Sequence, residues 1–461
     1  MAVTLEHPES TSDLRAHPAL SSRAAAEAFV GGVCFKLGPP GLIGAELEWF
    51  TVCRTGRTAR RGARRPAPDE THHLLTGPRP STELLAQALG PYAPRAIAPD
   101  SPARPLPGGS RVTVEPGGQI ELSSIAVTDA ADLCARLRAD EQRLRELLGT
   151  RSIRMVAAAA DPARTPRCQL GLPRYRAMEH YFTRIGPYGR LMMSNTAAAQ
   201  VSVDIGADHA DLTARWTALH AVGPALIAAF ACSPVLRGAP TGEWASQRMR
   251  TWLHLDPARA CPPVADWPDP VTGYARWALD APLLCVRRPE PTEGVAWAAP
   301  PEVTFGDWLS GALDEVIGRR PDIGDLRYHL TTLFPPVRPA GYFEVRYLDA
   351  QPGDGWTVPI TVVDALLSTP AAVADATAAA GATAGRWHDA ARYGLAEPEL
   401  RAAAGAVLEA AAAHSARPEP RLHAAIRRCA AGRPPQDETG QGEPARSTDP
   451  TEHPSTSGAA S

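Results

Sequence analysis

Several features that would narrow the function of this chain are scarce or missing. Its 461 residues include 47 basic side chains but a single lysine, Lys36, so a lone arginine carries little information by itself. With 50 acidic residues the formal net charge is only −3, which argues against a chain devoted throughout to nucleic acid or to an anionic membrane. Aromatic residues make up 6% of the chain, yet 44% of the residues are hydrophobic. We therefore expect a globular, enzyme-sized protein with a large core.

Paired cysteines and long apolar runs are also absent. Eight cysteines are scattered through the chain without any CxxC spacing, which favours a reduced setting over a disulfide scaffold or a zinc site. The N-terminus has no basic-then-apolar signal sequence. The most apolar stretch, residues 225–232, is far shorter than the ~20 residues that span a bilayer. We expect a cytoplasmic protein with no membrane partner.

Composition divides the chain into a central region and two tails. Residues 1–22 read as a flexible N-terminal segment and residues 431–461 as a disordered tail, because neither offers enough apolar surface to offset the entropy of ordering. Residues 23–430 are expected to form a single catalytic domain. Within this domain, apolar spacing predicts helices and local composition predicts loops. The helices are expected at 129–149, 210–231 and 370–413, and the loops at 54–66 and 92–110.

The loop at 54–66 has a composition of its own, with six arginines and no acidic residue. One interpretation is a patch for phosphate-rich ligands, which would make the chain a nucleic-acid-binding module. The other is a solvated insertion, which is the usual meaning of a charge run without a motif. The first interpretation leaves the acidic strands described next unexplained, so the second is preferred.

Four short segments alternate polar and apolar residues with the two-residue period of a half-buried strand. In each segment one face is apolar and the other carries carboxylates or carboxamides. They span residues 43–50, 111–124, 200–205 and 341–348. Ordinary exposed strands also have polar outer faces, but glutamate is depleted in strands. The composition therefore favours a functional face.

Four glutamates stand out on these faces: Glu46 and Glu48 in the first segment, and Glu115 and Glu121 in the second. A Pro-Gly-Gly bend at 116–118 brings Glu115 toward the others. If the strands are neighbours, four like charges converge, which is costly unless cations neutralise them. Carboxylate oxygens suit Mg²⁺, a hard ion that commonly joins protein to substrate phosphates. The pattern predicts a Mg-ATP site.

Phosphoryl transfer also needs cations for the transferring group. The candidates are Arg346, beside Glu344, and Arg248. The sequence has no GxxxxGK[ST] loop, no GxGxxG that opens a helix after a strand, no GxSxG and no HExxH, so other phosphate cradles, serine hydrolases and zinc proteases are unsupported. The scattered histidines are interpreted as structural or surface residues.

Ordered motifs then give a resemblance. The segments GAELEW, EPGGQIELS, RYRAMEHYF, MMSNTAAAQVSVD and LTTLFPPVRPAGYFEVRYLD resemble those of the plant-type glutamate-cysteine ligases, and more closely those of the actinobacterial ligases of ergothioneine biosynthesis. The resemblance runs from about residue 25 to 430. It implies an α+β, glutamine-synthetase-like fold, with a curved, mainly antiparallel sheet that has the active site on one face and helices on the other.

The resemblance also implies an activity and a set of residues. Such enzymes join the γ-carboxylate of L-glutamate to L-cysteine, with ATP and Mg²⁺, through a γ-glutamyl phosphate. Carried over by motif, the metal ligands are Glu46, Glu48, Glu115 and Glu121, the nucleotide-binding residues are Gln119, Glu121, Thr196, Gln200, Asp204 and Trp252, and the catalytic residues are Arg248, Glu344 and Arg346. Neither nucleic acid nor a membrane is an expected partner, and the oligomeric state is left open.

Two positions depart from the family pattern. Ser202 stands where an asparagine is expected, and Ser124 where a glycine is expected. Serine keeps a hydrogen-bonding group but is shorter than asparagine, so the selectivity for the amine is the property these positions would alter. A ligase of the same superfamily that joins a carboxylate to another amine is the nearest alternative.

Overall fold

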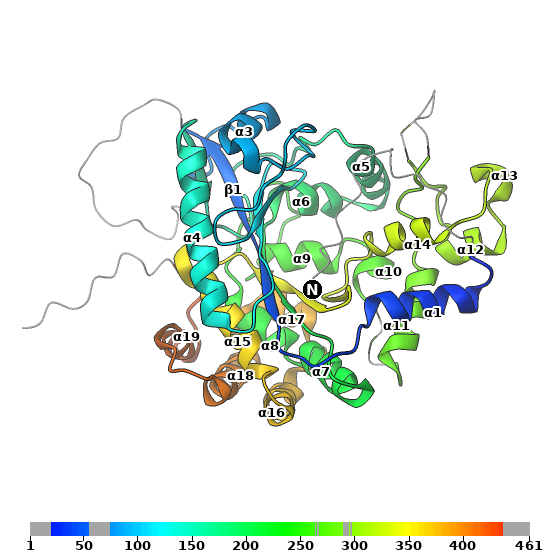
Figure 1. Ribbon diagram of the computed structural model, residues 1–461. Coiled ribbons are helices and arrows are strands. Elements are labelled where there is room, and N and C mark those ends of the chain that lie inside the picture. Colours follow the sequence, from blue (N-terminus) through cyan, green and yellow to red (C-terminus); the bar gives the residue numbers. More distant parts are fainter. Residues whose placement is uncertain are drawn as a thin grey trace, which may run out of the picture.

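An open sheet of seven antiparallel strands runs through the middle of the molecule (Figure 1). The computed structural model describes residues 20–54, 74–262, 264, 267–288, 295 and 297–436. The strand order is β2-β3-β1-β5-β7-β6, and β4 pairs with the second half of β1. The strands are β1 (Ile43–Cys53), β2 (Arg111–Val114), β3 (Ile120–Ser123), β4 (Ile153–Val156), β5 (Ala198–Val203), β6 (Val337–Pro339) and β7 (Phe343–Asp349).

The two-residue alternation predicted from the sequence matches these strands. Along β1, Ala45, Leu47 and Trp49 are buried in the main hydrophobic core, while Glu46 and Glu48 point to the other face. The predicted segment 111–124 forms two strands, β2 and β3, because a tight turn from Glu115 to Gln119 joins them. Its backbone closes with hydrogen bonds between these two residues and from Gly118 N to Glu115 O.

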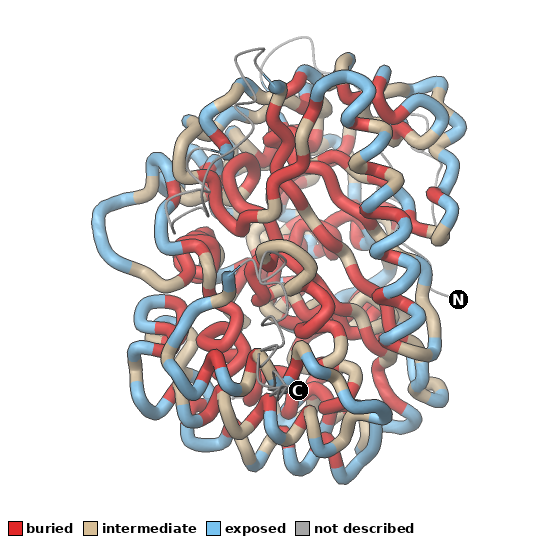
Figure 2. The backbone as a smooth tube through the Cα atoms, turned by 90° about the vertical axis from the view of Figure 1, so that its left-hand side faces the viewer, coloured by how far each residue is buried: buried red, intermediate tan, exposed pale blue. Residues whose placement is uncertain are grey.

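Helices cover the apolar face of the sheet. The helices α4, α7, α8 and α15 contact the strands directly, and α16, α18 and α19 form a layer outside them. Figure 2 shows the central strands buried and the outer turns of the helices exposed. These helices are α4 (Ala130–Gly149), α7 (His209–Ala221), α8 (Gly223–Phe230), α15 (Thr357–Leu366), α16 (Pro370–Ala380), α18 (Pro398–His414) and α19 (Pro420–Ala430).

Most of the remaining helices flank the polar face and one end of the sheet. In Figure 1, α5, α6 and α9 lie beside the strands, and α1, α11, α12 and α14 gather at the right-hand side. Their bounds are α1 (Arg23–Cys34), α3 (Thr82–Leu89), α5 (Pro173–Ile185), α6 (Tyr188–Asn195), α9 (Gln247–Leu253), α10 (Pro257–Ala260), α11 (Pro270–Asp280), α12 (Phe305–Ser310), α13 (Asp314–Ile317), α14 (Ile323–Leu330) and α17 (Trp387–Tyr393). An open antiparallel sheet with helices packed on one face confirms the expected fold class.

Helices form at all three predicted positions, but two of the predicted helices are divided into shorter ones. Residues 129–149 match α4. Asp129 is the N-cap of this helix, and its side chain accepts a hydrogen bond from Asp132 N. The stretch 210–231 is divided into α7 and α8, because Pro224 has no N–H to continue the first helix. The stretch 370–413 contains α16, α17 and α18, which glycine-containing turns at Gly381 and Gly394 separate.

The structure covers three of the predicted segments only in part. The N-terminal segment 1–22 is described from residue 20, and the tail 431–461 up to residue 436. The arginine-rich loop 54–66 lies outside the described residues except for Arg54. Within the described residues no single helix is long and apolar enough to cross a membrane. The segments Gly353–Leu366 and Pro370–Thr383 are long and apolar enough only when taken together, and they are bent by 114° relative to each other.

Candidate active site

A cavity of about 1310 Å³ lies over the polar face of the sheet. Its lining includes residues of β2 and β6, the first and last strands in the spatial order, so the cavity crosses the whole width of the sheet. The helices α5, α6, α9 and α14 contribute side chains from above. Its volume is above the range of roughly 300–1,000 Å³ that is typical of small-molecule sites.

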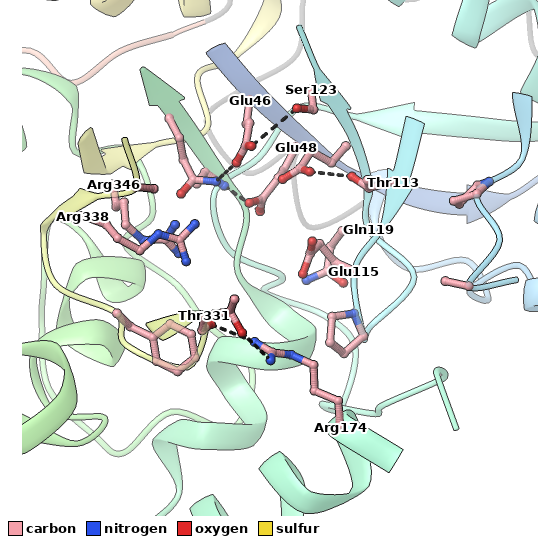
Figure 3. Close-up of a pocket in the computed structure, with 18 of the residues that line it drawn as sticks. Glu46, Glu48, Thr113, Glu115, Gln119, Ser123, Arg174, Thr331, Arg338 and Arg346 are labelled. Atoms are coloured by element: carbon pink, nitrogen blue, oxygen red, sulfur yellow. Dashed lines mark hydrogen bonds between the residues drawn. The ribbon is translucent and has the colours of Figure 1, made fainter. Parts of the chain in front are cut away.

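The four glutamates that the sequence singles out all line this cavity. Figure 3 shows Glu46 and Glu48 on β1 and Glu115 in the turn before β3. Glu121 belongs to β3. Glu48 and Glu121 are direct partners in the sheet register. The structure therefore brings together carboxylates that are up to 75 positions apart, as Glu46 and Glu121 are, in one polar cavity.

Each of three carboxylates has a fixed hydrogen-bond donor. Gln200 Nε2 donates to Glu46 at 3.0 Å, and the backbone N–H of Ala198 donates to Glu48 at 2.9 Å. The hydroxyl of Thr113 on β2 donates to Glu121. These contacts orient the carboxylates but leave oxygen lone pairs free to face the cavity.

Burial and mutual repulsion make the ionised forms of these glutamates costly. Burial, together with the neighbouring glutamates, raises the pKa values of Glu46 and Glu121 well above the ordinary range. Burial raises the pKa of Glu48 to about 7 against the opposing charge of Arg248, and it raises the pKa of Glu115 to about 8 with help from Glu48. A cation bound among these carboxylates would remove the cost.

These carboxylate oxygens fit a hard divalent cation whose coordination shell is completed by a substrate. Among the described residues no three His, Cys, Asp or Glu side chains converge closely enough to form a metal cage. Mg²⁺ does not need such a cage, because it is usually held by one or two carboxylates, substrate phosphates and water. Gln119 Oε1 and Gln200 Oε1 are buried without a hydrogen-bond partner, so further oxygens face the cavity.

Two arginines form a positive wall opposite the carboxylates. Figure 3 shows the guanidinium groups of Arg338 and Arg346 next to each other, across the cavity from Glu115 and Gln119. Both bind Glu344, with Arg338 Nε at 2.8 Å from its carboxylate. Burial alone would raise the pKa of Glu344, but the two arginines lower it to about 2.

Glu344 therefore has a different place from the one that the motif suggested. It is fully buried, and it does not belong to the lining of the cavity. Its carboxylate lies behind the two arginines, because β6 and β7 form a hairpin in which Arg338 is the register partner of Glu344. Glu344 binds both arginines and does not itself line the cavity.

Arg248 and Trp252 extend the positive wall along α9. Arg248 is 1% exposed, and its Nη2 donates to the carbonyl of Arg346 at 2.7 Å. The Trp252 ring lies under both guanidinium groups, 5.4 Å from that of Arg346 and 5.9 Å from that of Arg248. Trp252 Nε1 is buried without a hydrogen-bond partner, so this ring has a donor for a ligand.

Gln119, Thr196 and Gln200 also line the cavity, as the motifs implied. Gln119 Nε2 donates to the carbonyl of Thr196 at 2.8 Å, which ties the turn before β3 to the start of β5. Gln200 contacts Glu46 as described above. These residues support the polar floor between the carboxylates and the arginines.

Asp204 does not belong to this site, contrary to the motif assignment. Strand β5 ends at Val203, and Asp204 turns to accept hydrogen bonds from the backbone N–H groups of Gly41 and Leu42, at 2.9 and 2.8 Å. Ser202 and Ser124 are also absent from the cavity lining, and Ser124 Oγ accepts a hydrogen bond from Ala45 N. A role of either serine in amine selectivity has no support in the geometry.

Sequence reasoning did not single out Arg174 and Arg338 among the arginines that line the cavity. Arg174 on α5 donates two hydrogen bonds of 2.9 Å to Thr331, and its charge faces the cavity from the side of the helices (Figure 3). Arg338 is the other. Both lie in segments whose likeness to the family was noted, RYRAMEHYF and VRPAGYFEVR, but arginine is so common in this chain that neither was distinguished.

An open antiparallel sheet with carboxylates and arginines facing each other in one cavity is the framework of an enzyme that acts on small anionic molecules. Residues 42–439 match the model of glutamate-cysteine ligase family 2 (GCS2). The chain belongs to this family, which confirms the resemblance drawn from its motifs.

Individual relatives agree with the family match. The chain is 38% identical over 388 residues to the glutamate–cysteine ligase EgtA of Mycolicibacterium smegmatis, covering 83% of this chain and 82% of the relative. It is 30% identical over 249 residues to the chloroplastic glutamate–cysteine ligase of Nicotiana tabacum, covering 53% and 46%. A solved glutamate–cysteine ligase of Francisella tularensis in complex with AMP aligns over 86% of this chain and 83% of that one, with 15% identity and a TM-score of 0.41.

Proposed function

We propose that this protein is an ATP- and Mg²⁺-dependent glutamate–cysteine ligase that makes γ-glutamylcysteine as the first step of ergothioneine biosynthesis. The observation that carries the proposal is the cavity in which four glutamates face Arg338 and Arg346, in a chain of the glutamate-cysteine ligase family. The likeness to EgtA relatives over more than four fifths of the chain supports the pathway.

The acidic side of the cavity would hold the metal and the nucleotide phosphates. The ligands would come from Glu46, Glu48, Glu115 and Glu121, with Gln119 and Gln200 offering their unpartnered oxygens to water or substrate. When bound, Mg²⁺ would neutralise these carboxylates and spread the charge of the phosphates. The sheet keeps the carboxylates in place before any ligand arrives, so little reorganisation is needed.

The basic side would hold the groups that react. Arg338 and Arg346, which are partly buried, and Arg248, which is fully buried, would face the transferring phosphoryl group as it develops negative charge, and their burial would strengthen the attraction. An oxygen of the γ-carboxylate of glutamate attacks the terminal phosphorus, and the bond to ADP breaks. The neutral amine nitrogen of cysteine then attacks the acyl carbon, phosphate leaves, and the nitrogen loses one proton, so that an amide N–H remains. No protein nucleophile takes part.

The test is ADP release by the purified full-length chain. We expect ADP only when L-glutamate, L-cysteine and Mg²⁺ are all present, with γ-glutamylcysteine formed in equal amount. Glu121→Gln should remove nearly all activity, because Glu121 faces the cavity. Glu141→Gln is the matched control, since Glu141 is an equally buried glutamate that binds Arg145 and Trp356 outside the cavity. ADP formation that ignores both amino acids would contradict the proposal.

A panel of other amines in the same assay tests the choice of acceptor. Cysteine should give the highest kcat/KM, and a different amine in that place would mean another carboxylate–amine ligase of the superfamily. We also propose that residues 23–430 act as one catalytic domain and that the protein works in the cytoplasm, where a thiol substrate stays reduced.

A further inference from the structure

A buried hydrogen-bond network lies at the end of β7, behind the cavity. Its centre is Asp349, which is 2% exposed and lines no part of the cavity. The carboxylate accepts hydrogen bonds from Cys232 N at 3.0 Å, from Ser233 Oγ at 2.7 Å and from Ser246 Oγ at 2.8 Å. Three donors favour the ionised form of a buried carboxylate, and a nearby opposite charge favours it further.

The balancing charge is Arg248. Its Nη1 lies 3.9 Å from Asp349 Oδ1, and both side chains are at most 2% exposed. Burial tends to remove the charge of both groups: it lowers the pKa of Arg248 against the pull of Asp349, and it raises the pKa of Asp349 against the pull of Arg248. Without Asp349, Arg248 would be a buried cation beside another cation, Arg346.

The same network fixes where α9 begins. Ser246 is the N-cap of α9 and accepts a hydrogen bond from Met249 N, while its hydroxyl donates to Asp349. Ser233 Oγ accepts a hydrogen bond from Arg248 N at 3.3 Å. Asp349 therefore fixes the backbone of Arg248 through the two serines and attracts its guanidinium group directly. Asp349 lies on β7, the strand that also carries Arg346.

We propose that Asp349 is a positioning residue: through Ser233, Ser246 and its charge it holds Arg248 in the cavity, so that the guanidinium meets an anionic group of a substrate. That group is a carboxylate of an amino acid or a phosphate of the nucleotide, which share the same oxygen chemistry. The inference rests on the proposed function, because its assay measures that activity. Asp349 is expected to affect activity only by holding Arg248 in position.

A double-mutant cycle tests this dependence. In the full-length enzyme, Asp349→Asn keeps the shape of the side chain and removes its charge. Replacing a residue that orients a functional side chain typically costs about 10- to 100-fold in activity, and we expect a loss of that order in kcat/KM. In the Arg248→Gln background the same change should cost about twofold or less, because the residue through which it acts is gone. The anionic group is identified by which KM rises in Asp349→Asn. A higher KM for ATP indicates a phosphate, and a higher KM for glutamate or cysteine indicates a carboxylate.

Matched controls separate positioning from general damage. Asp161→Asn alters another fully buried aspartate that accepts backbone and arginine hydrogen bonds but lines no part of the cavity, and it should not depend on Arg248. If Asp349→Asn does not fold, Ser233→Ala removes the hydroxyl that donates to Asp349 and accepts from Arg248 N, and the cycle is run with that variant.

An equal loss from Asp349→Asn, or from Ser233→Ala, in both backgrounds would overturn the inference. An inactive wild type would contradict the proposed function instead, and the cycle then uses calorimetric binding of Mg-ATP and of glutamate. The inference is supported if the substitution weakens ligand binding when Arg248 is present and has little effect in the Arg248→Gln background. It is overturned if binding weakens equally in both backgrounds, or if wild type binds neither ligand.

Discussion

Replacing Glu48 by glutamine should stabilise the ligand-free protein while it removes activity. The pKa of Glu48 rises on folding from 4.5 to about 7, so the folded chain binds this proton more tightly than the unfolded chain does. Stability therefore falls as the pH rises from about 4.5 to about 7. One pH unit corresponds to about 1.4 kcal/mol, so the ionised carboxylate costs the fold about 3 kcal/mol at pH 8.

The assay is urea unfolding of wild type and Glu48→Gln at pH 5 and pH 8, with a chelator present. At pH 8 the variant should be more stable by about 3 kcal/mol, and at pH 5 the two should be nearly equal, since wild-type Glu48 is then protonated. The glutamine oxygen can still accept the bond from Ala198 N. Adding Mg²⁺ and ATP should narrow the gap at pH 8, because a ligand that binds only the folded state stabilises wild type.

Glu141→Gln is the control with the opposite sign. This buried carboxylate is bound by Arg145 and Trp356, so its loss should destabilise the protein by about 1–3 kcal/mol at pH 8. Glu48→Gln that is less stable than wild type at pH 8, or that differs from it equally at both pH values, would refute the reasoning that burial of the ionised carboxylate destabilises the ligand-free protein.

Three further outcomes follow from single contacts. Gly117→Ala would place a Cβ 2.4 Å from the carbonyl oxygen of Ser194, so thermal unfolding should show a loss of about 1–3 kcal/mol, whereas Gly149→Ala, where a Cβ meets nothing within 4 Å, should not. Glu344→Gln should lower stability at pH 7 in urea unfolding, and the difference should vanish as the pH falls from about 4.5 toward 2, because the arginines hold the folded pKa at about 2. Ser202→Ala should change the kcat/KM ratio of cysteine to serine by less than about twofold, since this serine lines no part of the cavity; a larger change would restore its role in selectivity.

The strands and their acidic face could be predicted because the two-residue period is a local property. In GAELEW the alternation alone places Glu46 and Glu48 on one face, and the structure agrees. Local pattern fails where the strand stops. Asp204 continues the alternation of β5 in the sequence, yet the strand ends one residue earlier and the carboxylate turns to the loop before β1.

Residues whose role depends on a distant partner could not be placed from sequence. Glu344 and Arg346 share a face, but only the β6–β7 hairpin shows that Arg338 closes over the carboxylate. Arg174 reaches the cavity from a helix, and nothing in its own segment distinguishes it from the many other arginines. In both cases the decisive information is which elements pack together, and that depends on the whole core.

The pairing of β1 has a consequence for how the protein opens. At Glu46 and Leu47 this strand is bonded on both sides, to β3 and to β5. Amide protons in such a doubly paired centre escape to solvent only when much of the domain unfolds. Glu46 is thus carried by backbone that should exchange with deuterium among the slowest in the chain, so partial opening elsewhere leaves its position undisturbed.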